Sequence, residues 1–293
     1  MREFTVSNTL LRDGPALQAR AGADGYLFFK ELIDTDLLRE LRQQILTLCF
    51  EAGWLKMATD PYLGINAPNV THIEGQVEYM RLYNQLMRFE TFHAFAHQPA
   101  LLAMLDSLFG EETLVHARNI ARIIFPQAVE HTTPAHQDYL YIKGTEETWT
   151  AWIPLGNCPQ TLGSLAVMPG SHRHGMYPVQ RSLGAGGHRI ETEDLPFEWC
   201  ASDFAEGDIL LFHSLLIHRG LPNQTPDRLR LSVDYRYQPK SHPLVEGSLL
   251  PHYGQLTWDD IYKGWKSDRY QYYWTRRRAD GGKADRAAAS TSR

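Results

Sequence analysis

The sequence predicts a mainly β domain of the sandwich or barrel kind with flanking helices. From Leu114 onward, short runs rich in β-branched and aromatic residues alternate with turn residues, and no helical pattern separates them. The preceding third instead has apolar residues at helical spacing. The 293 residues, of which 43% are hydrophobic and 22% charged, provide enough material for a large core.

Two stretches of the first third have the helical pattern. In the first, apolar residues recur between Leu37 and Cys49, and Asp34 or Thr35 is a candidate N-cap. In the second, apolar residues recur from residue 92 to residue 108, and Gly110 is expected to end the helix.

The remainder of the chain is expected to form a β core and two accessory segments. Strands are predicted at 120–125, 148–155, 164–168, 208–213 and 229–237. Residues 174–200 contain several Gly and Pro, and we expect them to form a long loop over the barrel mouth. We therefore expect one domain over residues 1–278, with a helical flank at about 24–112, a β core at about 113–240, an aromatic packing segment at 241–278, and then a disordered tail at 279–293.

Composition narrows the classes of partner. The net charge of −5 does not favour a dedicated nucleic-acid or acidic-membrane binder. Three widely spaced cysteines, Cys49, Cys158 and Cys200, fit neither a disulfide framework nor a thiolate zinc site. The first residues contain no apolar run, and no stretch approaches the roughly 18 apolar residues of a membrane span. We expect a cytoplasmic protein with no nucleic-acid or membrane partner.

The first candidate site is the tripeptide His136-Gln137-Asp138. In a strand, side chains at i and i+2 share a face, so His136 and Asp138 can converge on one ion while Gln137 points to the other face. With 13 His and 34 Asp+Glu in the chain, such a pair is expected by chance, and a second one, His72 and Glu74, exists.

Downstream residues distinguish the two pairs. An open iron site needs a second histidine to complete a facial triad of two histidines and one carboxylate. After Asp138, the apolar run 207–217 is followed by His218, which we place at the end of a strand. Twelve residues later, Arg230 and Ser232 share one strand face and together can bind a carboxylate. The pair His72 and Glu74 is not followed by a comparable histidine and arginine.

Four motifs, in this order, resemble the phytanoyl-CoA dioxygenase-like family of iron(II)/2-oxoglutarate oxygenases. They are 136–138, 149–155, 163–172 and 207–230. The resemblance implies a double-stranded β-helix (jelly-roll) core, with iron(II) held by His136, Asp138 and His218. It also implies that Arg230 grips 2-oxoglutarate and that Trp152 lies beside this cosubstrate.

Further expectations follow from the same resemblance. Ser232 joins the cosubstrate site, and a basic residue ahead of the core, at the position of Arg81, adds a second charge contact. The family uses O₂ to hydroxylate, or less often desaturate, a C–H bond while 2-oxoglutarate becomes succinate and CO₂. Related halogenases have a small residue in place of the carboxylate, so the presence of Asp138 favours hydroxylation.

Other readings of these residues remain open. His213 competes with His218, and Arg228 competes with Arg230. Trp152 can be a core aromatic, Arg81 a surface arginine, and Ser232 an ordinary strand hydroxyl. A zinc hydrolase with the same triad and a non-enzymatic jelly-roll binding protein are the alternative functions. We expect a small-molecule substrate, such as a natural-product intermediate, rather than an acyl-CoA.

Overall fold

The computed structural model of the protein describes residues 1–127, 129–184 and 186–275. Residues 276–278 of the predicted packing segment and the predicted tail 279–293 lie outside the described residues. The strands are β1 (Tyr26–Phe29), β2 (Thr113–Val115), β3 (Ile120–Ile124), β4 (Trp149–Pro154), β5 (Leu165–Val167), β6 (Gln180–Arg181), β7 (His188–Arg189), β8 (Cys200–Ala201), β9 (Ile209–His213), β10 (His218–Gly220) and β11 (Arg230–Pro239). The helices are α1 (Gly14–Asp24), α2 (Thr35–Glu51), α3 (Val77–Leu86), α4 (Glu90–Ala94), α5 (Pro99–Phe109), α6 (Tyr139–Ile142) and α7 (Trp258–Tyr262).

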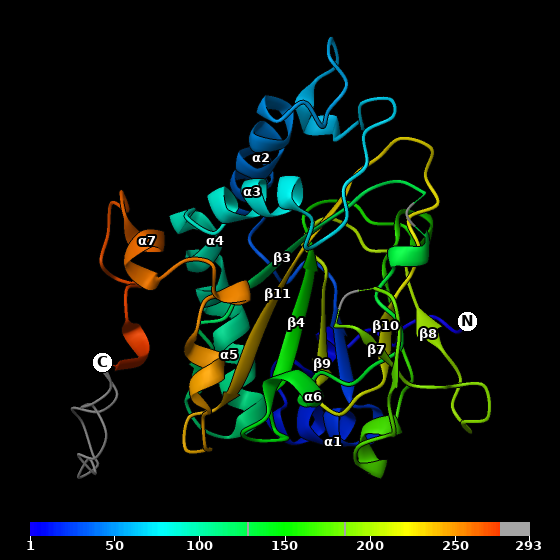
Figure 1. Ribbon diagram of the computed structural model, residues 1–293. Helices are drawn as coiled ribbons and strands as arrows, with labels where there is room; N and C mark the ends of the chain where they lie inside the picture. Colours follow the sequence, from blue (N-terminus) through cyan, green and yellow to red (C-terminus); the bar gives the residue numbers. More distant parts are fainter. Residues whose placement is uncertain (128, 185, 276–293) are drawn as a thin grey trace, which may run out of the picture.

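The strands form a larger and a smaller sheet around one interior. The larger sheet has the order β1-β9-β4-β11-β2, with β3 also pairing with β11, and the smaller has the order β10-β5-β8. All pairings within these two sheets are antiparallel. Helices α2 to α5 cover the outer side of the larger sheet, and β8 and β10 lie on its other side (Figure 1). The predicted jelly-roll core with helical flanks is confirmed.

Strand β11 has two chemically different faces. Its odd-numbered residues, from Leu231 to Tyr237, are apolar or aromatic and belong to the core under the helices. Its even-numbered residues, from Arg230 to Gln238, are polar and still buried. Because side chains alternate along a strand, these polar groups point to the interior between the two sheets. The sheet therefore presents an apolar face to the helices and a row of buried polar side chains to the site.

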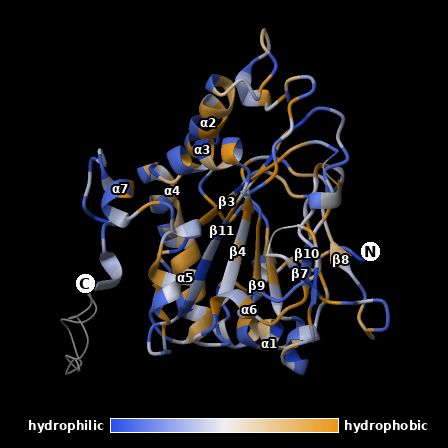
Figure 2. Ribbon diagram, in the orientation of Figure 1, coloured by the Kyte–Doolittle hydropathy of each residue, from blue (hydrophilic) through white to orange (hydrophobic). Residues whose placement is uncertain are grey.

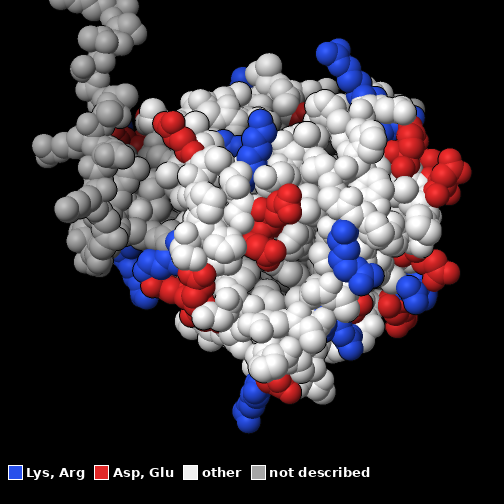
Figure 3. Space-filling model, turned by 90° about the horizontal axis from the view of Figure 1, so that it is seen from below, with Lys and Arg blue, Asp and Glu red and all other residues white. Residues whose placement is uncertain are grey.

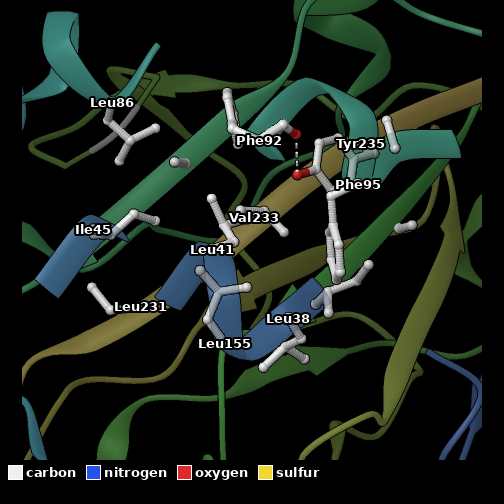
Figure 4. Packing of buried hydrophobic residues seen from close by; sticks show 14 of the residues in the cluster. Leu38, Leu41, Ile45, Leu86, Phe92, Phe95, Leu155, Leu231, Val233 and Tyr235 are labelled. Carbon is white, nitrogen blue, oxygen red and sulfur yellow. Dashed lines mark hydrogen bonds between the residues drawn. The ribbon is translucent and has the colours of Figure 1, made fainter. Parts of the chain in front are cut away.

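The helix layer follows the amphipathic pattern read from the sequence. Asp34 is the N-cap of α2, and its side chain accepts a hydrogen bond from the backbone N–H of Asp36 at 2.8 Å. The apolar face of α2, with Leu38 and Leu41, packs on Val233 of β11 (Figure 4). The colouring in Figure 2 shows the same alternation of apolar and polar residues along the helices. Burial of this face attaches the helix layer to the sheet.

One hydrogen bond joins β11 to this layer and provides a stability test. The fully buried Tyr235 hydroxyl donates to the backbone carbonyl of Phe92 at 2.7 Å. We expect Tyr235→Phe to lower the free energy of unfolding by about 1–3 kcal/mol, because the carbonyl loses its buried donor. Urea unfolding measures this change. Tyr272→Phe, which removes an exposed bond to Asp259, is the control, and equal losses in both variants would contradict the assignment.

The five predicted strands correspond to β3, β4, β5, β9 and β11 within two residues at each end. The expectation of a purely helical first third is wrong in one respect, because β1 lies there and pairs with β9 at the edge of the larger sheet. The predicted loop at 174–200 contains a two-stranded hairpin, β6–β7. Both pieces are short; β1 depends on a distant partner, β9, for its backbone hydrogen bonds, whereas β6 and β7 pair with each other.

The surface agrees with the composition. Lys and Arg are interspersed with Asp and Glu on the face seen from below, and neither sign forms a continuous patch (Figure 3). No helix in the described part of the chain is long and apolar enough to cross a membrane. All three cysteines are buried free thiols.

Candidate metal centre

The two candidate histidines face each other across neighbouring segments of the smaller sheet. The N–H of His136 donates to the carbonyl of His218 at 3.0 Å, and the reverse bond measures 3.1 Å. Residues paired in this way project their side chains to the same face. The two imidazole centroids accordingly lie 4.1 Å apart.

The expected positions of two ligands within their strands are wrong. The apolar run does not reach His218 as one strand: β9 ends at His213, the chain turns, and His218 begins β10 in the other sheet. Asp138 is not two residues along a strand from His136, because it has helical torsion angles and is the N-cap residue of α6. The turn into α6 nevertheless directs its carboxylate back to the histidines.

The three side chains meet at one point. The Asp138 Oδ1 atom lies 3.6 Å from His136 Nε2 and 3.8 Å from His218 Nε2. These three buried residues are the one group of potential metal ligands found among the described residues. Gln137 points to the other face, as predicted, where its side chain bonds the backbone of Gly175, Tyr177 and Leu215.

The second oxygen of Asp138 is occupied by the protein. Its Oδ2 atom accepts a bond from Thr150 Oγ1 at 2.7 Å and contacts the Arg236 guanidinium at 3.3 and 3.4 Å. Burial raises the pKa of Asp138, but Arg236 and the two imidazoles outweigh it and hold the pKa well below its usual range. The carboxylate is therefore ionised, with Oδ1 directed at the histidines.

The histidine tautomers also suit a metal. His136 Nδ1 bonds the carbonyl of Pro134 at 2.8 Å, and His218 Nδ1 bonds the carbonyl of Leu216 at 2.9 Å. A carbonyl only accepts, so each Nδ1 donates to it, which leaves each Nε2 facing Asp138. Burial, followed by the neighbouring His136, lowers the pKa of His218 to about 3, which keeps the ring neutral. Two imidazoles and one carboxylate oxygen match the donor set of a facial triad.

Arg230 lies deeper in the same interior. Its side chain is buried, and Nη1 donates to Ser232 Oγ. The guanidinium carbon lies 5.8 Å from the ring centroid of Trp152, and the Nε atom is buried without a hydrogen-bond partner among the described residues. No carboxylate in that part of the chain forms an ion pair with Arg230. The structure thus places a free buried cation, Trp152 and Ser232 together, beside the triad.

Arg81 is not part of this group, and that expectation is corrected. Its side chain is 69% exposed on α3 and pairs with Glu78 at 3.0 Å. Arg81 lines a different hollow, between α2 and α3, away from the triad. Because α3 packs its apolar residues inward, position 81 falls on the outer face of the helix.

The alternative residues also lie elsewhere. The His213 ring is near Glu147, 3.8 Å away, in a separate hollow. Arg228 is exposed on the loop before β11. His72 packs against the Trp54 ring, and Glu74 pairs with an arginine, so this second His-x-acid pair does not form a metal site.

Sequence reading missed Arg236 and Thr150. Both could have been found by extending the two-residue alternation: from Arg230, every second residue of β11 up to Arg236 faces the interior. Thr150 follows from Trp152 by the same rule on β4. Their contact with Asp138, however, depends on the register between β4, β11 and the turn at 138.

A pocket of about 250 Å³ opens next to the triad. His136 and Asp138 form part of its wall, together with Arg118, Tyr141, Gly186 and His252. Gly186 belongs to the β6–β7 connection and accepts a bond from the Tyr141 hydroxyl at 3.0 Å. The predicted loop at 174–200 thus contributes to the pocket wall. A smaller cavity on the other side of the triad contains Arg230 and Trp152.

The sequence of this chain is similar to those of known proteins. The family model described as phytanoyl-CoA dioxygenase (PhyH) matches residues 22–231. The 1-deoxypentalenic acid 11-beta-hydroxylase of Streptomyces arenae is 28% identical over 271 residues, covering 85% of this chain and 89% of that protein. The peroxisomal phytanoyl-CoA dioxygenase of Rattus norvegicus is 22% identical over 262 residues, covering 84% of this chain and 74% of that protein.

Solved structures agree on the fold. The epimerase SnoN, solved with Fe³⁺, alpha-ketoglutarate and nogalamycin RO, superposes with a TM-score of 0.56 at 18% identity, covering 80% of this chain and 86% of that one. The apo form of EctD from S. alaskensis superposes with a TM-score of 0.52 at 19% identity, covering 87% and 86%. The sequence match to the family model spans well over half of the chain, and the chain therefore belongs to the phytanoyl-CoA dioxygenase family of iron(II)- and 2-oxoglutarate-dependent oxygenases.

Proposed function

We propose that His136, Asp138 and His218 hold iron(II) and that Arg230 binds the distal carboxylate of 2-oxoglutarate, so that the enzyme hydroxylates a C–H bond of a small organic molecule. The observation that carries the proposal is the convergence of two Nε2 atoms and one Oδ1 atom beside a buried arginine that forms no ion pair among the described residues. When bound, the iron and 2-oxoglutarate supply the activation of O₂ for C–H oxidation, with release of succinate and CO₂.

The protein's own groups orient and insulate these partners. Thr150 and Arg236 hold one oxygen of Asp138, so the other faces the metal position. Ser232 fixes the Arg230 guanidinium, whose planar fork can bind a carboxylate through two parallel bonds. The apolar side chains of Trp152, Leu165 and Phe212 line the inner cavity and limit access of water.

The substrate class follows from the pocket and the relatives. The pocket of about 250 Å³ is smaller than the roughly 300–1,000 Å³ of drug-sized ligand sites, which supports a compact substrate. The Streptomyces relatives are named for hydroxylation of 1-deoxypentalenic acid. We propose a compact natural-product intermediate as the substrate. We also propose that the helical flank, the β core and the C-terminal segment form one domain that contains the site. We further propose that this domain works in the cytoplasm, where its three buried thiols stay reduced.

The test uses absorbance in the absence of oxygen. We expect wild-type protein mixed anaerobically with Fe²⁺ and 2-oxoglutarate to show the weak visible charge-transfer band of the metal chelate. His136→Ala should lose the band, because one of the three ligands is missing. Succinate release after admission of air provides the second measurement.

His213→Ala is the matched control, since this histidine is buried in a separate hollow. It should keep the band. A wild-type protein that forms no band and releases no succinate would contradict the oxygenase proposal, and tight zinc binding with hydrolysis would favour the alternative enzyme class.

A further inference from the structure

The pocket beside the triad is lined by three arginines, and one of them has no carboxylate partner among the described residues. The three are Arg118, Arg122 and Arg236. Arg122 pairs with Glu74 at 2.6 Å and with Asp234 at 3.3 Å, and Arg236 contacts Asp138. The Arg118 side chain has a single hydrogen bond in the described part of the chain, from Nε to the carbonyl of Leu250 at 3.3 Å. Its two terminal nitrogens are therefore free to bind a ligand.

A second donor points to the same ligand chemistry. The Tyr83 hydroxyl accepts a bond from the N–H of Ala121 at 3.3 Å and lies 2.7 Å from His252 Nδ1. The described residues offer this hydroxyl no other acceptor, so it donates its hydrogen bond to Nδ1, and the His252 proton lies on Nε2. Burial, and then the three arginines of the pocket, lower the pKa of His252 to about 2. His252 is therefore a neutral hydrogen-bond donor surrounded by positive charge. A bound anion would offset that charge and accept the hydrogen bond.

This cation is separate from the one assigned to the cosubstrate. The backbone N–H of His116 bonds the carbonyl of Arg236, which places the segment containing Arg118 at the far end of β11 from Arg230. Six residues of extended strand between Arg230 and Arg236 span about 20 Å. Arg118 lines the outer pocket and Arg230 the inner cavity, and the triad residues His136 and Asp138 border both. One five-carbon diacid held by Arg230 cannot also occupy Arg118.

We propose that Arg118 is the anchor for a single carboxylate on the substrate, which it binds together with His252 and thereby aims the rest of the molecule at the triad. The proposal rests on the oxygenase function proposed above. A guanidinium with both terminal nitrogens free matches a carboxylate by two parallel bonds. Arg118 is the arginine of this pocket that has no carboxylate partner among the described residues, so a compact substrate with one carboxylate matches it.

The experiment compares a rigid acid with its uncharged amide. Adamantane-1-carboxylate and adamantane-1-carboxamide are titrated into the anaerobic protein loaded with Fe²⁺ and 2-oxoglutarate, and binding is followed by calorimetry and by the shift of the visible band. We expect wild-type protein to bind the acid at least about tenfold more tightly than the amide, because a hydrogen bond to a charged group adds this much. Arg118→Gln should bind the two alike.

Two further variants complete the design. Arg118→Lys keeps the charge without the planar fork, so an intermediate preference is expected. Arg12→Gln removes one exposed arginine on the N-terminal turn and should behave as wild type. All variants should show the unperturbed band before the acid is added, because Arg118 does not contact the triad.

The outcomes separate the two proposals. A wild-type protein that forms the band but shows no preference for the acid, or an Arg118→Gln variant that retains the preference, overturns the role of Arg118 and leaves the oxygenase assignment intact. Failure of wild-type protein to form the band overturns the oxygenase assignment, and the carboxylate anchor with it.

Discussion

Replacement of Asp138 by alanine is expected to lower iron(II) affinity by well over a hundredfold and to abolish turnover. Loss of an outer partner of a metal ligand already costs about 10–100-fold in affinity, and Asp138 is itself a proposed ligand. The substitution also leaves the Arg236 guanidinium, with 8% of its side chain exposed, as an unmatched cation beside the metal position. Both effects oppose binding of a dication.

Stability must be measured alongside, because removing one partner of a buried ion pair costs about 3–5 kcal/mol. Asp138→Asn keeps the shape of the side chain and should lose turnover with a smaller change in melting temperature. Asp36→Asn, on a side chain 92% exposed on α2, is the control. Iron affinity is followed by competition with a coloured chelator. Near-normal affinity in Asp138→Asn with an intact fold would show that the carboxylate is not a ligand.

Arg230→Leu is expected to weaken 2-oxoglutarate binding about 10–100-fold, the value of charge-assisted hydrogen bonds to a carboxylate. The same substitution should leave the melting temperature of the ligand-free protein unchanged or slightly raised. Burial lowers the pKa of Arg230, because desolvation disfavours the charged form of its guanidinium. A leucine beside Trp152 and Phe212 removes this cost.

Opposite effects on binding and stability distinguish a cosubstrate anchor from a structural arginine. Arg228→Gln, two residues earlier on the exposed loop, should change neither quantity. The measurements are the KM for 2-oxoglutarate from succinate release and the melting temperature without ligand. A variant that unfolds more easily while its KM stays constant would make Arg230 a structural residue.

The parts of the fold and site that depend on local sequence patterns could be predicted from the sequence. The alternation in β11 identifies the inner face that carries Arg230, and the helical spacing around Leu41 identifies the face of α2 that packs on the sheet. The order of the motifs identifies the family. Local patterns fail where a side chain acts through a distant partner, as with Arg236, which reaches Asp138 across the interior.

The misplacement of Arg81 has a related cause. Position 81 lies in a helix whose apolar face is well defined, yet the direction from that helix to the site depends on how α3 packs on its neighbours. No spacing rule within α3 contains this information. The turn at Asp138 is a similar case. The helical torsion angles of this one residue determine where its carboxylate points, and the motif His136-Gln137-Asp138 does not reveal them.

The cross-strand pairing of His136 with His218 has a consequence for how this enzyme can diversify. The two imidazoles are fixed by facing positions on a ladder, so loops in the chain between them can change length without moving these two positions. That intervening chain includes the β6–β7 hairpin, which borders the substrate pocket at Gly186. Insertions and deletions in this hairpin can change the shape of the substrate pocket while the triad stays intact. Substrate selectivity can therefore evolve without a change in the metal centre.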